Sequence, residues 1–260
     1  MLTKHHSRVC TFFAADFDPR FGPEVSSAAS RIYEEHRPPK YRATMPSLFQ
    51  FAWPETRNLL VVTHSRVAWQ TLGLRAWNDS LQEHLSVVTM GLQTMHVSAF
   101  KRIGFKIVAY LPLSMSHAEM CKLMFGAFVL PEEDFQQVSK GGRDPLLHME
   151  GESGGLEYLL IVTSLSKAQA SKHFFSFPNL DLFLAEKYLD VGLKDFHDRV
   201  TESDCFLVDI DLFRTNVGID CLEGFVKEAL GTAEAVTDAC VRRLLSKPQE
   251  PREKSWGGNH

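Results

Sequence analysis

The sequence lacks the motifs by which many metal-dependent and cofactor-dependent enzymes are recognised. Its 11 histidines show neither H-x-x-x-H nor H-E-x-x-H spacing, and its five cysteines include no C-x-x-C pair. The glycine pairs at 141–142 and 154–155 are not followed by the Gly-Lys-Ser/Thr of a phosphate-binding loop. We therefore expect no cofactor and no metal, and a non-enzymatic protein is favoured over an enzyme. A Cys–His nucleophilic pair stays open, because its members meet only in the folded chain.

Long apolar runs are also missing. No window approaches the roughly 20 apolar residues that span a bilayer, and Met1–His6 is too polar to begin a signal peptide. The cysteines are odd in number and widely spaced, which is typical of reduced, buried thiols rather than of a disulfide framework. These absences predict a soluble cytoplasmic protein that does not enter a membrane.

An excess of positive charge is absent as well. The 260 residues include 28 basic and 32 acidic side chains, a net charge of −4, so non-specific binding to nucleic acid is not favoured. A hydrophobic content of 44% is enough to bury a sizeable core. The composition therefore predicts a globular protein of one large domain or two ordinary ones.

Residues 1–131 show alternating strand and helix patterns. Strands are predicted over residues 8–17 and 47–53, over Asn58–Trp69 as one long strand with a turn or bulge near His64–Ser65, and over 103–111; helices are predicted over 24–36 and from Asn78 to Met95. The element order is β-α-β-β-α-β, the order of ferredoxin-like units with an antiparallel sheet. A further helix follows the capping box formed by Ser116 and Glu119.

The second half is predicted to be another α+β unit. Residues 132–155 are rich in glycine and proline and predict a mobile connection, after which strands are expected over 156–164, 172–177 and 205–213. A long apolar stripe predicts a closing helix from Leu222 to Leu245, so the second unit would span 156–246. The polar tail 247–260 is expected to be disordered. The chain as a whole is therefore predicted to be an α+β protein.

Two acidic side chains give the sharpest enzymatic alternative. Asp209 and Asp211 alternate with Val208 and Ile210, so both carboxylates would lie on one face of a strand. That geometry would suit a divalent metal and hence a metal-dependent hydrolase. The same alternation also fits a strand with one apolar face and one mixed face. The Gly-Thr that would follow these acids in a phosphatase is missing.

A second alternative is an RNA- or single-stranded-DNA-binding module. Ferredoxin-like sheets often stack exposed aromatic side chains on bases, and basic residues can lie beside them. The candidates in this sequence are Phe12, Phe13, Phe105 and Tyr110, with Arg66, Arg102 and Lys106. The aromatic-glycine signature of such RNA-binding strands is not matched.

A set of short segments resembles one known family. The segments are Phe17-Asp18-Pro19, the strand after Asn58, the helix from Trp77, Arg102-Ile103-Gly104-Phe105, Val208-Asp209-Ile210-Asp211 and the closing helix. Together, over about residues 7–245, they resemble a sporadically distributed prokaryotic family of uncharacterised proteins known chiefly as a sequence profile. Its members often carry a Glu-x-x-His pattern in the closing helix, where this chain has Glu234 without the histidine. The resemblance implies no reaction, and its patchy distribution points to mobile or defence-associated genes.

A protein-interaction or regulatory role is the leading hypothesis. It rests on the missing catalytic motifs, on the long closing helix and on Met115, Met120 and Met124, whose pliable side chains would suit a partner surface. Ordinary core packing would explain the same methionines. The resemblance extends the hypothesis to an accessory component of a prokaryotic antiviral or CRISPR-type defence system. A protein partner is expected, and nucleic acid is not favoured.

Overall fold

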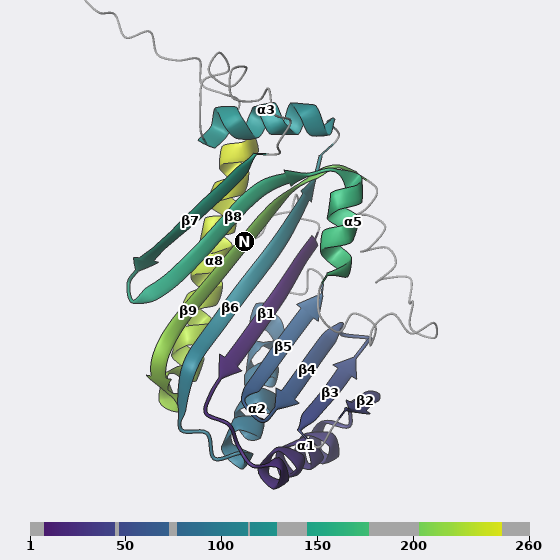
Figure 1. Cartoon of the computed structure of the whole chain (residues 1–260), viewed down its shortest axis with the longest axis vertical. Coiled ribbons are helices and arrows are strands. Elements are labelled where there is room, and N and C mark those ends of the chain that lie inside the picture. The colour runs from purple at the N-terminus through teal and green to yellow at the C-terminus, as the bar shows by residue number, and fades with distance from the viewer. Residues whose placement is uncertain are drawn as a thin grey trace, which may run out of the picture.

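The computed structural model describes residues 8–44, 47–72, 77–113, 115–128, 145–176 and 203–245. Its described strands form one nine-stranded antiparallel sheet (Figure 1). The strand order is β2 (Lys40–Ala43), β3 (Leu48–Trp53), β4 (Asn58–Thr63), β5 (Arg66–Leu72), β1 (Arg8–Asp16), β6 (Ala99–Pro112), β9 (Cys205–Gly218), β8 (Leu156–Leu165) and β7 (Leu146–Ser153). The α+β class and the antiparallel sheet are therefore as predicted.

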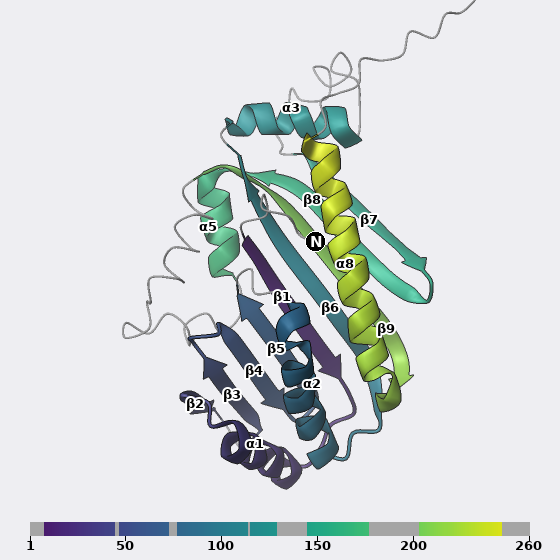
Figure 2. The same ribbon diagram turned by 180° about the vertical axis from the view of Figure 1, so that it is seen from behind.

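Helices cover the two faces of the sheet unequally. Helices α1 (Gly22–His36), α2 (Trp77–Thr94) and α8 (Leu222–Leu245) lie along one face, here called the three-helix face (Figure 2). The opposite face, here called the α5 face, carries α5 (Lys167–Phe175), while α3 (His117–Phe128) crosses one end of the sheet. None of the described helices is long and apolar enough to cross a membrane.

Strand β6 shows why each face has its own character. Ile103, Phe105 and Ile107 point to the three-helix face and are buried in the main core, because alternate side chains of a strand leave opposite faces. Val108 and Tyr110 point to the α5 face, in a smaller core with Ala170 and Phe174 of α5. The alternation along β6, together with its register to β9, determines which side chains of these two strands lie on each face of the sheet.

A polar network is buried beneath α2. The His84 Nε2 lies 3.1 Å from the Asn58 Nδ2, and the Asn58 Oδ1 accepts a hydrogen bond of 2.7 Å from the Thr71 hydroxyl. His84 is only 2% exposed and its ring lies 4.4 Å from that of Trp69. Burial lowers the pKa of His84 to about 4, because the charged imidazolium would lose its hydration there.

The segment predicted as one strand from Asn58 to Trp69 is two strands. β4 ends at Thr63 and β5 begins at Arg66, and the two pair from Asn58↔Thr71 to Val62↔Val67. The Ser65 N–H donates to the Thr63 Oγ1 at 3.3 Å, and this side-chain bond helps to close the two-residue turn. The turn near His64–Ser65 therefore reverses the chain instead of interrupting a single strand.

The strand predicted over residues 172–177 is wrong, since Lys167–Phe175 form the helix α5. The Ser166 Oγ accepts from the Gln169 N–H, and the Gln169 Oε1 accepts from the Ser166 N–H at 2.7 Å. This capping box starts a helix before the segment could extend as a strand. Ala170 and Phe174, four residues apart, then bury one face of the helix against the sheet.

The two predicted halves share the sheet. β6 and β9 pair from Ala99↔Gly218 to Pro112↔Cys205, which joins the N-terminal strands to β8 and β7. Through Pro112 the described order has six strands where the sequence predicts four, β1-α1-β2-β3-β4-β5-α2-β6.

The predicted connection 132–155 contains β7, whereas residues 129–144, 177–202 and the predicted tail 247–260 lie outside the described residues. The capping box at Ser116 and the closing helix Leu222–Leu245 are confirmed.

Candidate functional site

Asp209 and Asp211 lie together on the α5 face of β9, as the alternation predicts. The Lys106 Nζ lies 2.7 Å from the Asp209 Oδ2, and the Arg102 Nη2 lies 2.9 Å from the Asp211 Oδ2. Both cations come from β6, whose antiparallel register sets Lys106 directly opposite Asp211. The result is a charged row of Arg102, Lys106, Asp209 and Asp211, in which each acid has a basic partner.

Burial dominates the chemistry of Asp209. The residue is 7% exposed, and burial raises the pKa of its carboxyl, while the Lys106 ammonium acts in the opposite direction. Asp211 and Arg102 keep 21% and 34% of their side-chain surface exposed, so their ion pair is partly screened by water. The Lys106–Asp209 pair is therefore the part of the row on which folding stability depends most.

Glycine at position 104 makes room for Arg102. The guanidinium of Arg102 lies over Gly104 and over the ring of Phe213, with its Cζ 4.4 Å from the ring centroid. A Cβ at Gly104 would sit 2.9 Å from the Arg102 Nη1. The missing side chain thus lets Arg102 lie flat along the strand and reach Asp211.

Replacing Gly104 with alanine is expected to lower the free energy of unfolding by about 1 kcal/mol, because the guanidinium must leave Phe213 and Asp211. Gly231→Ala is the matched control: it adds a methyl group where nothing lies within 4 Å, in α8. That control is expected to raise stability by about 0.5–1 kcal/mol through helix propensity. Urea unfolding measures both, and a Gly104→Ala variant as stable as the parent would contradict this account.

Tyr110 and His173 extend the row toward α5. The Tyr110 hydroxyl lies 2.7 Å from the His173 Nδ1, and the two rings meet edge to face. Burial lowers the pKa of His173, and the negative charge of Asp209 partly opposes that shift. Burial also raises the pKa of Tyr110, so its phenol stays protonated and can donate.

The charged row does not resemble a metal centre. A divalent cation needs several free oxygen or nitrogen ligands, whereas a lysine or an arginine already lies against each of these two carboxylates. Among the described residues, no group of three or more histidine, cysteine, aspartate or glutamate side chains is placed to hold a metal ion. The geometry favours the interpretation of Asp209 and Asp211 as partners in a structural ion-pair row.

The methionines predicted to form a partner surface lie mainly in the hydrophobic core. Met120 and Met124 are 0% exposed and belong to the main core, and Met115 packs against that core with partial exposure. Their spacing of four residues places Met120 and Met124 on the inner side of α3, which explains the burial. Two of the three therefore present no side-chain surface to a partner.

The four aromatic candidates for base stacking do not share a face. Phe13 and Phe105 point to the three-helix face and are buried in the main core. Phe12 and Tyr110 belong to the α5 face, where Tyr110 is 0% exposed and Phe12 is partly buried. An exposed stacking surface built from all four is thus not assembled, because neighbours in a strand leave opposite faces.

A cysteine and a histidine do meet on α3. The Cys121 Sγ lies 3.9 Å from the His117 Nε2 and 3.3 Å from the Ser164 Oγ. The sulfur–nitrogen distance is long for proton transfer, and the serine is fully buried under the helix. The geometry does not single this pair out as a nucleophilic site. All five cysteines are free thiols, and Cys10, Cys205 and Cys240 are buried.

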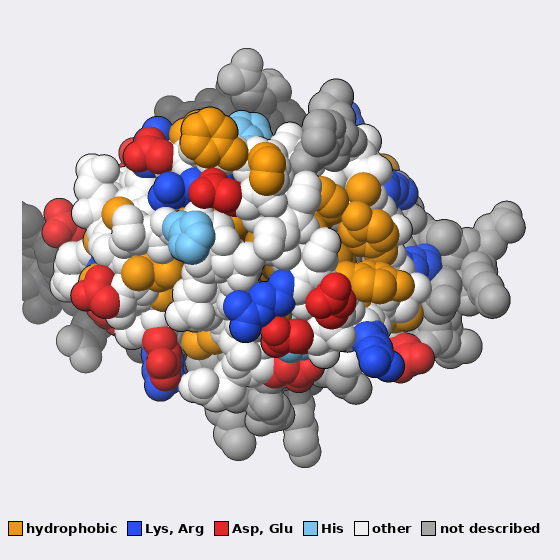
Figure 3. Space-filling view, turned by 90° about the horizontal axis from the view of Figure 1, so that it is seen from below, with side chains coloured by type: hydrophobic (Ala, Val, Ile, Leu, Met, Phe, Trp, Pro, Cys, Tyr) orange, Lys and Arg blue, Asp and Glu red, His pale blue; other side chains and the backbone are white. Residues whose placement is uncertain are grey.

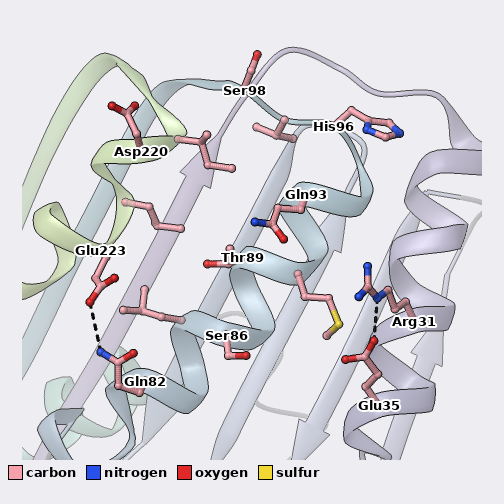
Figure 4. A pocket seen from close by; sticks show the side chains of 15 residues that line it. Arg31, Glu35, Gln82, Ser86, Thr89, Gln93, His96, Ser98, Asp220 and Glu223 are labelled. Carbon is pink, nitrogen blue, oxygen red and sulfur yellow. Dashed lines mark hydrogen bonds and ion pairs between the residues drawn. The ribbon is translucent and has the colours of Figure 1, made fainter.

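A groove of about 910 Å³ lies between α1, α2 and the start of α8 (Figure 4). Arg31 pairs with Glu35 at 2.8 Å within α1, and Glu223 accepts from Lys227 within α8 and from Gln82 of α2. At this end of the molecule, Figure 3 shows acidic, basic and apolar side chains interspersed. These charged groups already have partners in the helices that line the groove, so they do not single it out as a binding site.

Strand β7 forms one of the two outer edges of the described sheet, and most of its residues are exposed. All eight of its residues pair with β8, from Leu146↔Thr163 to Ser153↔Leu156, and no described strand pairs with its other edge. Leu146 is 62% exposed and Met149 is 44% exposed, on opposite faces of the strand. This outer edge of β7 offers main-chain donors and acceptors together with apolar side chains.

Comparison with known proteins gives no further guide to the site. No protein-family model matches the chain, and no curated protein sequence matches it. The sequence named Arg102 and Lys106 only as basic candidates of the nucleic-acid alternative, which it did not favour, and their pairing with Asp211 and Asp209 was not predicted. The signal was present in the sequence: residues 102, 104 and 106 share one face of a strand, and a second strand carries two acids at the same spacing.

Proposed function

We propose that the chain is a non-enzymatic interaction protein and that the outer edge of β7 is its docking element. The main support for this proposal is the eight-residue strand β7, which pairs with β8 along one edge and with no described strand along the other. Adding a strand to such an edge is a common mode of recognition, in which main-chain hydrogen bonds supply affinity and alternate side chains supply specificity.

The opposite edge of the sheet shows the contrast. Strand β2 has only four residues, and Lys40 and Arg42 alternate along it. Short, positively charged edge strands are a common protection against unwanted pairing. β7 is twice as long and contains neither lysine, arginine nor proline. Among the described strands, one edge of the sheet is thus short and positively charged, whereas the other is long and carries no lysine, arginine or proline.

The side chains of β7 set requirements on the added segment. Glu150 and Glu152 lie on the α5 face with Leu146 and His148, while Leu147 and Met149 lie on the three-helix face. An added segment that alternates polar or basic side chains with apolar ones would match both faces. The ion-paired row on β6 and β9 supports this non-enzymatic role, because its carboxylates already have partners within the sheet.

We also propose that the N-terminal strands include a ferredoxin-like unit and that the protein acts as an accessory component of a prokaryotic defence system. The neighbouring order β4-β5-β1-β6, with α1 and α2 on one face, supports the first proposal. The second rests on the resemblance to a sporadically distributed prokaryotic family. Flanking genes that belong to no defence or mobile element in any close relative would count against it.

Site-specific crosslinking tests the docking element. A photo-crosslinking residue placed at Met149 of the full chain, expressed in a prokaryotic host, is expected to give a defined adduct that mass spectrometry can identify. The same residue at Leu245, which is 45% exposed at the end of α8, is the matched control and is expected not to give it. A second substitution, Leu146→Lys, should abolish the adduct. Equal adducts at both positions, or none at Met149, would reject β7 as the docking element.

A further inference from the structure

We propose that the strand added to β7 is the β7 strand of a second copy of this chain, antiparallel and centred on Met149. The inference rests on the proposed function of the β7 edge and names its partner. It is carried by the charge and size pattern of the strand, which in this register sets His148 opposite Glu150 twice and places no carboxylate opposite another. The product would be a two-fold symmetric dimer with a sheet continuous across both subunits.

Symmetry restricts the possible registers. Two antiparallel edge strands related by a two-fold axis must have that axis perpendicular to the sheet, so the α5 faces of both copies lie on the same side. Residues opposite each other then share a face, and side chains change face at every residue. The axis must therefore pass through a residue position, and neighbouring registers differ by moving the axis from one residue to the next.

Charge chooses among these registers. With the axis at Met149, His148 of each copy lies opposite Glu150 of the other, so two complementary pairs form on the α5 face. With the axis at Glu150, His148 lies opposite Glu152 but the Glu150 carboxylate faces its own copy, and with the axis at His148, two imidazoles face each other. Two carboxylates directly opposite each other destabilise a sheet, whereas an imidazole N–H can donate to a carboxylate opposite it. Within one chain the His148 Nε2 already lies 3.0 Å from the Glu150 Oε1, so both groups are present on that face.

Side-chain size gives the same register. With the axis at Met149, Leu147 lies opposite Gly151 of the other copy, and Met149 lies opposite Met149. The Tyr158 side chain leans over Gly151, where a Cβ would meet its hydroxyl oxygen at 2.6 Å. Leu147 of the second copy would therefore contact an aromatic ring in the place of the missing side chain, an arrangement that compensates for a glycine in an edge strand.

The expected dimer is weak and reversible. A single pair of edge strands buries less surface than the roughly 1,200–2,000 Å² of standard stable interfaces, so a dissociation constant in roughly the micromolar range is expected. Assembly would then depend on the concentration of the protein. A partner with a free strand edge could compete for β7 with the second copy.

Sedimentation velocity of the full-length protein over a range of about 1–200 µM tests the proposal. The parent is expected to shift reversibly from monomer to dimer as its concentration rises. Met149→Lys, which sets two ammonium groups across the axis, should remain monomeric. Leu245→Lys adds the same charge at another exposed apolar residue and should dimerise as the parent does.

A charge exchange tests the register itself. His148→Glu sets a carboxylate opposite Glu150 twice, so dimerisation is expected to weaken roughly tenfold. Adding Glu150→Lys to that variant restores both opposite-charge pairs when the axis is at Met149, and dimerisation should recover. With the axis at Glu150, the same double variant would place lysine opposite lysine and no recovery would follow. Circular dichroism of each variant confirms that it is folded.

The outcomes separate this inference from the proposed function. A protein that stays monomeric at 200 µM but crosslinks to another protein from Met149 overturns the inference and leaves the docking element in place. A dimer whose mass is insensitive to Met149→Lys, or a charge exchange without recovery, also overturns the inference. A monomer with no adduct at Met149 rejects both the inference and the docking element.

Discussion

Replacing Lys106 with methionine is expected to lower the free energy of unfolding by about 2 kcal/mol at pH 7. The Asp209 carboxylate is 7% exposed and lies 2.7 Å from the Lys106 ammonium, which is its closest counter-charge. Without that ammonium a charged carboxylate would remain buried beside β6, and stranding one member of a buried pair costs several kcal/mol. The partial exposure of Lys106 reduces the expected loss to the stated value.

The companion variant Asp209→Asn separates the ion pair from packing. In that background the amide has no charge to compensate, so adding Lys106→Met is expected to cost well under 1 kcal/mol. Acid should also lessen the loss in the single Lys106→Met variant, because burial raises the pKa of Asp209 and protonation removes the stranded charge. Urea unfolding of the four proteins at pH 7 and pH 5 measures both effects. An equal loss in both backgrounds would show that Lys106 acts through packing alone.

His84 is expected to make the protein less stable in acid. Its pKa in the folded chain is lowered to about 4 from an ordinary value near 6.5, so the folded state prefers the neutral ring. The neutral ring contributes fully to the free energy of unfolding above about pH 6.5. That contribution falls as the pH drops toward 4, because in this range the unfolded chain takes up the proton and the folded chain does not. Between pH 7 and pH 5, the titration of His84 is expected to lower the free energy of unfolding by about 2 kcal/mol.

The variant His84→Gln isolates this effect. Glutamine can still offer an amide to Asn58, but it does not titrate, so the loss of stability between pH 7 and pH 5 should shrink by about 2 kcal/mol. At pH 7 the variant is expected to be less stable than the parent, because the ring contact with Trp69 is lost. His64→Gln, at the exposed turn between β4 and β5, is the control for losing a histidine. An unchanged pH dependence in His84→Gln would contradict the burial of a neutral ring.

The local elements were predictable where one physical signal acted alone. The strand β1, the helix α8 and the capping box of α3 follow from residue periodicity and from side-chain capping, both of which act within a few neighbouring residues. The prediction failed at Asn58–Trp69 because a polar turn at His64–Ser65 lay inside an otherwise continuous apolar run. At 172–177 the predicted strand is wrong because the capping box of Ser166 and Gln169 starts a helix that continues to Phe175.

The candidate site was predictable only in part. Alternation placed Asp209 and Asp211 on one face correctly, since the direction of a side chain from a strand is a local property. Their partners Lys106 and Arg102 lie about one hundred residues earlier in the chain, and the register of β6 with β9 brings them together. The methionines of α3 show the same limit, because a helix stripe does not reveal whether it faces a core or a partner.

The sequence by itself determined the elements, their apolar faces and the α+β class, because these depend on periods of two and 3.6 residues and on caps. Only the tertiary structure decided that both halves contribute to one sheet, that the carboxylates of β9 are paired with the cations of β6, and that β7 lies at an outer edge. Strand order and register arise from contacts between distant residues, which compete across the whole chain. For this reason a short strand at Leu146–Met149 can be suggested from the sequence, whereas its place at an outer edge of the sheet follows only from the fold.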